Sequence, residues 1–161
     1  MTGQLLQFLE SLRAPVAAMA GLPVESVIVY LQQDLMMHIA SAISKHQCAV
    51  LLGISGMDIG GKADQRVPGP PVDAALEVAV WTPEVVLSAG NPLVMDVAES
   101  IVSGLHGRKP PEGAAGGALI PAFRNMNLSA VGGEGRPRTL VATLTFTVPV
   151  YLRARRLTAA D

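Results

Sequence analysis

The stretch Thr139–Leu152, TLVATLTFTVPVYL, decides the fold, because apolar residues stand at every second position. These residues are Leu140, Ala142, Leu144, Phe146, Val148, Val150 and Leu152. Successive side chains of a strand point to opposite faces of a sheet, so the alternation gathers these residues on one face. The sequence therefore predicts a long strand with one face on the core and the other against solvent or a neighbouring molecule.

Three further strands are predicted upstream of that stretch. Cys48–Ile54 is an apolar run that is too short for an independent helix, which indicates a buried strand. Ala74–Val86 and Phe123–Val131 are predicted to be the second and third strands. Between them, the glycines and prolines of residues 56–71 predict a long loop, and the Gly/Ala-rich residues 112–119 predict another.

Apolar residues at helical spacing predict helices over residues 4–20 and Gln32–His46. A third helix is expected to begin at Asn91, because Asn caps free N–H groups and the following proline suits the first helical position. Gly107 can adopt the left-handed conformation that ends it. The β-branched run Val24–Tyr30 fits either a short strand or the lead-in to the second helix.

Together these elements predict an α+β fold: a mostly antiparallel four-stranded sheet with two helices packed on one face. The order is helix, strand, strand, helix, strand, strand, behind an N-terminal extension. The corresponding division is a partly helical extension over residues 1–31, an α+β domain over residues 32–156 and a C-terminal tail over residues 157–161.

The composition narrows the class of protein. The chain has 161 residues, a length that predicts one domain, and 50% of them are hydrophobic, which is enough for one core. Only 16% are charged, so we expect part of the surface to lie against other subunits. A formal net charge of -1 gives no global basic field for nucleic acid. The single cysteine excludes an internal disulfide and fits a reducing compartment. We expect a soluble, intracellularly made protein, because no signal peptide or membrane-spanning stretch is evident.

Gly56 to Lys62 spells G-x-x-x-x-G-K, the pattern of a loop that binds nucleotide phosphates. Such a loop also needs a Ser or Thr for magnesium directly after the lysine, and a helix that begins there. Here Ala63 follows Lys62, and the prolines of residues 68–71 oppose a helix. A small enzyme that uses Lys62 or Cys48 therefore remains the weaker hypothesis, and a connecting loop is the favoured interpretation.

The histidines and the cysteine predict no catalytic or metal site. His38 and His46 are eight residues apart, too far for a zinc-binding i, i+4 pair, and His106 fits the last turn of its helix. Cys48 begins an apolar strand, where a free cysteine behaves as a small hydrophobic residue.

Basic residues near the C-terminus form the candidate interface. They are Arg153, Arg155 and Arg156 after the last strand and Arg136 and Arg138 before it, together with Lys62 and Arg66 of the glycine-rich loop. Such a cluster can contact phosphates or an acidic partner surface, or it can be a solvated tail that keeps the protein soluble. A nucleic-acid-binding module is thus a third hypothesis.

Four segments carry a resemblance to a known family. They are LQQDLMMHIASAISKHQ (residues 31–47), NPLVMDVAESIVSGLHGRKP (residues 91–110), FRNMNLSAVGG (residues 123–133) and RPRTLVATLTFTVPVYLR (residues 136–153). With the hairpin of residues 48–86 between them, the chain resembles the tail terminator, or tail completion, proteins of tailed bacteriophages, including those of Mu-like prophages with contractile tails. The resemblance covers residues 32–153 and leaves residues 1–31 unassigned.

The resemblance implies a hexameric ring on the head-proximal end of the tail tube, made in the cytoplasm of the host bacterium. The ring stops polymerisation of the tube and offers a surface to the head or neck. Implied partners are the tail tube protein, sheath and neck or connector proteins, and genomic DNA that passes through the lumen without sequence-specific binding. Neither catalysis nor a cofactor is implied. Another tail or neck ring protein of a contractile injection system is the alternative.

Overall fold

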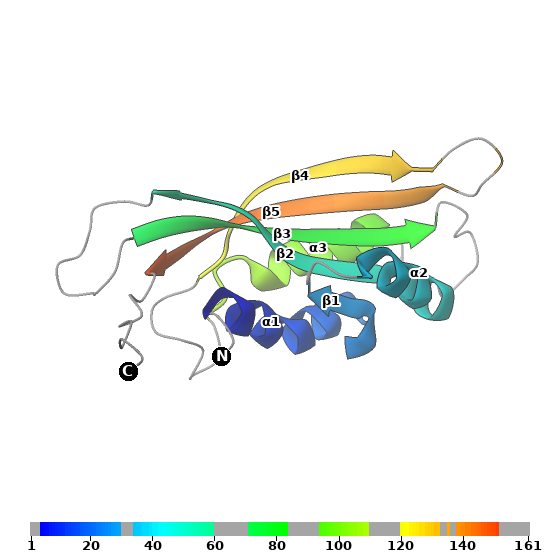
Figure 1. Cartoon of the computed structure of the whole chain (residues 1–161), viewed down its shortest axis with the longest axis horizontal. Coiled ribbons are helices and arrows are strands. Elements are labelled where there is room, and N and C mark those ends of the chain that lie inside the picture. The colour runs from blue at the N-terminus through cyan, green and yellow to red at the C-terminus, as the bar shows by residue number, and fades with distance from the viewer. Residues whose placement is uncertain are drawn as a thin grey trace, which may run out of the picture.

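A computed structural model describes residues 4–29, 34–59, 71–83, 94–109, 120–132, 135 and 138–151 (Figure 1). The elements are, in chain order, α1 (Gln4–Ala20), a 3₁₀ turn (Val24–Ser26), β1 (Val27–Val29), α2 (Leu35–His46), β2 (Ala49–Ile59), β3 (Pro71–Pro83), α3 (Val94–Leu105), β4 (Ala122–Val131) and β5 (Thr139–Tyr151). The predicted α+β class and the order of the four long strands and the two helices α2 and α3 are confirmed.

The sheet has five strands in the order β1-β2-β3-β5-β4, and it is mixed. The predicted four-stranded antiparallel sheet is therefore wrong in one respect: β1 adds a fifth strand, parallel to β2, with Val27 opposite Val50. The other three pairings are antiparallel. Val27 and Val29 are buried in the main core, so hydrophobic burial holds this three-residue segment in the sheet.

β2 and β3 form a longer hairpin than predicted. The loop assigned to residues 56–71 is wrong at both ends, because Gly56–Ile59 continues β2 and pairs with Val72–Ala75 of β3. A register shift between Ile54 and Gly56 marks a β-bulge, where one extra residue bends the strand and lets pairing resume. The glycines of this segment predict a loop, but residues 56–59 form a strand because they pair with β3 across the hairpin. Residues 60–70, with Lys62 and Arg66, lie outside the described residues.

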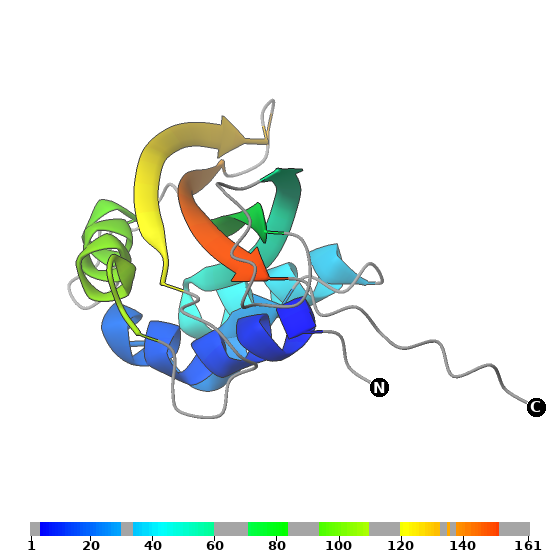
Figure 2. The ribbon, with the colours of Figure 1, turned by 90° about the vertical axis from the view of Figure 1, so that its left-hand side faces the viewer.

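Helices α1 and α3 cover one face of the sheet and form the main core. Alternate residues of β2, β3 and β5 point into it, and Phe146 is fully buried there together with Ile101 and Leu105 of α3. α1 runs through Pro15 to Ala20, because Val16 and Ala17 beyond the proline are buried in the same core. Figure 2 looks roughly along the strands and shows a curled sheet with β4 arching at its outer edge.

α2 packs on the opposite face of the sheet, so the predicted placement of the two helices on one face is also wrong. Its Ile39 and Ala42 form a separate cluster with Ala49 of β2, and Trp81 of β3 packs against that cluster. In Figure 1, α3 lies behind the strands and α2 lies in front of them. α2 thus covers the second face of the sheet only around Ala49 and Trp81.

The end of α3 is tied to the start of β4. Gly107 has a φ of 70°, the left-handed conformation expected of the residue that ends the helix. Its N–H donates to the carbonyl of Pro121 at 2.8 Å, and the N–H of Phe123 donates to Nδ1 of His106 at 3.0 Å. These bonds fix where β4 enters the sheet.

Candidate interaction surface

Most of the predicted interface cations cannot be placed. Lys62, Arg66, Arg136, Arg153, Arg155 and Arg156 lie outside the described residues. Arg138 is described: it is exposed and directly precedes β5, at the end of the β4–β5 connection. The proposed basic cluster therefore stays a prediction.

The phosphate-loop spelling begins inside a paired strand. Gly56 to Ile59 are matched residue by residue with β3, so their backbone follows the sheet. A phosphate loop instead leaves its strand at the first glycine, and its N–H groups converge on the ligand. Over Gly56–Ile59 the backbone is therefore that of a hairpin strand, and the rest of the spelling, residues 60–62, lies outside the described residues.

The candidate nucleophile is buried. Cys48 is fully inaccessible, and burial raises the pKa of its thiol to about 12, which keeps the sulfur protonated at neutral pH. Among the described residues, His, Cys, Asp and Glu side chains nowhere gather in the groups of three that a metal ion needs. Nor does any described helix combine the length and apolar character required to cross a membrane.

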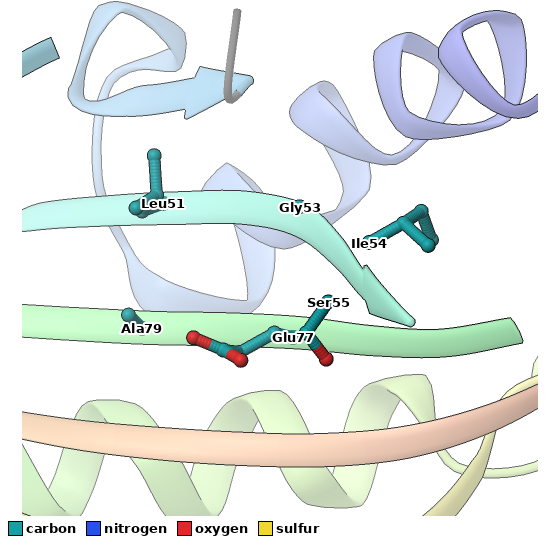
Figure 3. A pocket seen from close by; sticks show the side chains of 6 residues that line it. All are labelled: Leu51, Gly53, Ile54, Ser55, Glu77 and Ala79. Carbon is teal, nitrogen blue, oxygen red and sulfur yellow. The ribbon is translucent and has the colours of Figure 1, made fainter. Parts of the chain in front are cut away.

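A shallow hollow of about 270 Å³ lies on the sheet face that α2 leaves open (Figure 3). Leu51, Gly53 and Ser55 of β2 line it beside Glu77 and Ala79 of β3. Of the side chains labelled in Figure 3, only Glu77 is ionisable, and the Ser55 hydroxyl lies 3.5 Å from the carbonyl oxygen of Ala75. Glu77 and the Ser55 hydroxyl are thus the two polar side chains of this lining, and the other residues that line it are apolar.

A second hollow of about 400 Å³ separates α2 from the end of β4 and the start of β5. Met36, Ile43 and Trp81 line it on one side, and Val131 and Thr139 on the other. Nε1 of Trp81 is buried without a hydrogen-bond acceptor, and such an unsatisfied donor lowers the free energy of unfolding of the isolated chain.

Exposed apolar side chains also lie along β4, the outermost strand on one side of the sheet. Met126 stands opposite Leu144 and Leu128 opposite Ala142, so both point to the core face of the sheet. Leu144 and Ala142 are fully buried, yet Met126 is 39% and Leu128 51% exposed. β4 therefore extends the core face beyond the helices that cover it.

The other edge of the sheet shows the same feature. Met57 of β2 stands opposite Ala74, which is fully buried on the core face, but Met57 itself is 52% exposed. The sequence predicts subunit contacts on the sheet and on residues 56–71, where Met57 lies, but the interface residues that it names are all basic and do not include Met126 or Leu128. A signal was present for β4, because the alternation of polar and apolar residues in NMNLSAV matches a strand with one apolar face.

No protein-family model matches the sequence, and no curated protein matches it either.

Proposed function

We propose that the protein is a structural component of a phage virion, which caps the tail tube as a ring, ends tube polymerisation and provides the surface for joining the head or neck. The observation that carries the proposal is the set of exposed apolar side chains on the core face near both sides of one sheet, Met126 and Leu128 on β4 and Met57 on β2. Apolar side chains that continue a buried face into solvent can be covered by a partner.

A closed ring explains why such side chains occur near both sides of the sheet. Each subunit of a ring uses two different surfaces, one for each neighbour, and both are covered when the ring closes. The low charged content of 16% agrees with a chain that covers much of its surface in this way. A nucleotide-binding enzyme has less support, because Gly56–Ile59 is part of a strand.

In this proposal the ring contacts the tail tube protein on one side and sheath and neck or connector proteins on the other. Genomic DNA passes through the lumen without sequence-specific contacts, and the protein has no catalytic role or cofactor. The basic residues Arg153, Arg155 and Arg156 then lie near an interface or the lumen.

The proposal can be tested with the tail tube protein of the same phage. Purified chain added to polymerising tube should give short tubes of uniform length with a ring at one end in electron micrographs. Deleting its gene from the phage should give overlong tubes and tails without heads. Tubes of unchanged length in both experiments would contradict the proposal. A label on the chain found away from the head-proximal end would instead favour another ring of the tail or neck.

A further inference from the structure

The sheet ends in two edges with unpaired backbone. β4 is the last strand on one side, and over its ten residues no strand of the described part of the chain pairs with its outer edge. On the other side, β1 pairs with Val50–Leu52, and none of the strands in the described residues pairs with the outer edge of Gly53–Ile59 of β2. By contrast, Nε of Arg13 donates to the carbonyl of Val27 at 3.0 Å, which satisfies part of the edge of β1.

Each open edge carries a bulge, which is one protection against pairing, but lysine and proline are absent from both open segments. Asn125–Val131 contains no charge and no proline, and Gly53–Ile59 contains a single charge, on Asp58. Lysine, proline or an inward-pointing charge commonly prevents an exposed edge from adding a strand of another chain. These two edges are therefore open to β-augmentation, in which main-chain bonds supply affinity and side chains supply specificity.

The two edges also match each other. Met126 and Met57 both lie on the core face, and both are partly exposed. Asn125 and Asp58 both lie on the opposite face, being paired with Thr145 and Asp73. An antiparallel alignment that sets Met126 opposite Met57 therefore sets Asn125 opposite Asp58, with these four side chains on matching faces. Leu128 stands opposite Ile54 when Ser55 is left unpaired, as it is in the pairing with β3.

Charge supports the same alignment. Arg124 is the only charged residue of β4, and Asp58 is the only one on the open part of β2. The alignment brings Arg124 within one residue of Asp58, on the face where Nε of Arg124 already donates to the hydroxyl of Thr147 at 2.7 Å. Pairing of two β4 strands with each other would offer Arg124 no acidic partner on the facing strand.

We propose that β4 of one copy pairs antiparallel with Gly53–Ile59 of the next copy, so that the sheets of successive copies join head to tail. Met126 and Leu128 then continue the apolar surface of Met57 and Ile54 across the joint. The inference rests on the proposed function only in that copies of the chain associate, and it names the surfaces that join them.

Two lysine variants test this pairing by sedimentation velocity. Met126→Lys and Met57→Lys each place a charge in the joint, and each should raise the concentration of half-assembly by about 30-fold or more, the effect of losing one anchor of an interface. Met37→Lys is the matched control: Met37 is 68% exposed and belongs to α2, not to either of the two strands in the proposed joint, so this variant should assemble like the wild type.

Mixing the two variants separates head-to-tail pairing from other arrangements. Met57→Lys keeps an intact β4 edge and Met126→Lys keeps an intact β2 edge, so the mixture should form a 1:1 dimer and nothing larger. If Met57→Lys alone still assembled like the wild type while Met126→Lys did not, β4 would pair with itself and the inference would be wrong. Normal assembly of both variants would also overturn it.

Folding and function are controlled separately. Circular dichroism should show unchanged secondary structure, and Met126→Gln and Met57→Gln repeat the test if a lysine variant unfolds. Rings that form with both edges altered would overturn the pairing and leave the proposed function standing. Assembly that depends on both edges, in a protein that does not stop tube growth, would support the pairing and contradict the proposed function. A wild-type chain that stays monomeric at every concentration and on tubes would contradict both.

Discussion

β5 and β4 are neighbouring strands with the same alternation of side chains, and they differ in what covers them. Leu144 of β5 and Met126 of β4 stand opposite each other on one face of the sheet. Leu144 is fully buried, whereas Met126 is 39% exposed. Alternation along a strand thus determines which residues share a face. Whether that face is buried or exposed to solvent depends on how far the packed helices extend over it.

The extent of α1 and α3 explains where burial of the core face of the sheet ends. α1 and α3 share the main core with β2, β3 and β5, and Phe123 at the start of β4 is the residue of that strand that packs against this core. Beyond the register shift between Phe123 and Asn125, every side chain of β4 is exposed. The bulge therefore marks the change from the covered to the open part of the sheet.

The largest effect is expected at Phe146. Phe146→Ala should lower the free energy of unfolding by about 3–5 kcal/mol, because it empties a large core site. It also removes an edge-to-face contact with Phe123, whose ring centroid lies 5.6 Å away. Urea denaturation measures the loss. The half-exposed Thr145, one residue along on the other face, is the control, and equal losses at the two positions would show that the assigned faces are wrong.

Leu144 and Met126, which stand opposite each other, test the difference in burial between β5 and β4. Leu144→Ala should cost about 2–5 kcal/mol of stability in the monomer, as for other buried leucines. Met126→Ala removes a side chain that stays largely solvated, so it should cost less than about 1 kcal/mol. Both are measured by denaturation under dilute conditions, where copies do not associate. A loss at Met126 as large as that at Leu144 would mean that β4 is covered within its own chain.

The cover over β5 depends on a close approach of α1 to α3. A Cβ atom at Gly104 would lie 2.7 Å from Cγ and Sδ of Met19, so Gly104→Val should lower the free energy of unfolding by about 1–3 kcal/mol. Gly56→Ala on the open part of β2 is the contrasting change, since nothing lies within 4 Å of its Cβ position. Thermal unfolding of both variants measures the difference, and an unchanged midpoint for Gly104→Val would argue against the tight helix contact.

The smallest effect at neutral pH concerns Cys48, at the covered end of the sheet. Its pKa is raised from 9.0 to about 12 by burial, so the folded state keeps the thiol proton where the unfolded state releases it. This contribution to stability should be constant below pH 9 and decrease as the pH rises towards 12. At pH 8 a thiol reagent should label the folded chain far more slowly than the unfolded chain. Equal labelling rates would contradict the burial.

Much of the fold was predictable because local pattern and tertiary position agree there. β5, β4, α3 and its end at Gly107 follow from apolar spacing and capping residues alone. For β1 the sequence allows either a short strand or the lead-in to α2, because three β-branched residues form a strand only when a partner strand lies beside them. The side of the sheet that α2 occupies depends on Trp81 and Ala49, which lie far from it in sequence.

The candidate surface was predicted less well. The sequence predicts an interface of basic residues, because charged residues can be recognised without knowledge of the fold. The exposed rows at Met57 and Met126 are apolar, and their residues look like core until the structure shows where the helices end. The proposal that they form a joint between copies rests on register and exposure together.

Amide hydrogen exchange, followed by mass spectrometry as the concentration of the chain increases, tests most directly whether another copy covers β4. We predict that β5 is protected at every concentration, and that amides of Ala122–Val131 and Gly53–Ile59 exchange rapidly in the monomer and become protected together as copies assemble. Assembly that leaves both segments in rapid exchange would contradict the account.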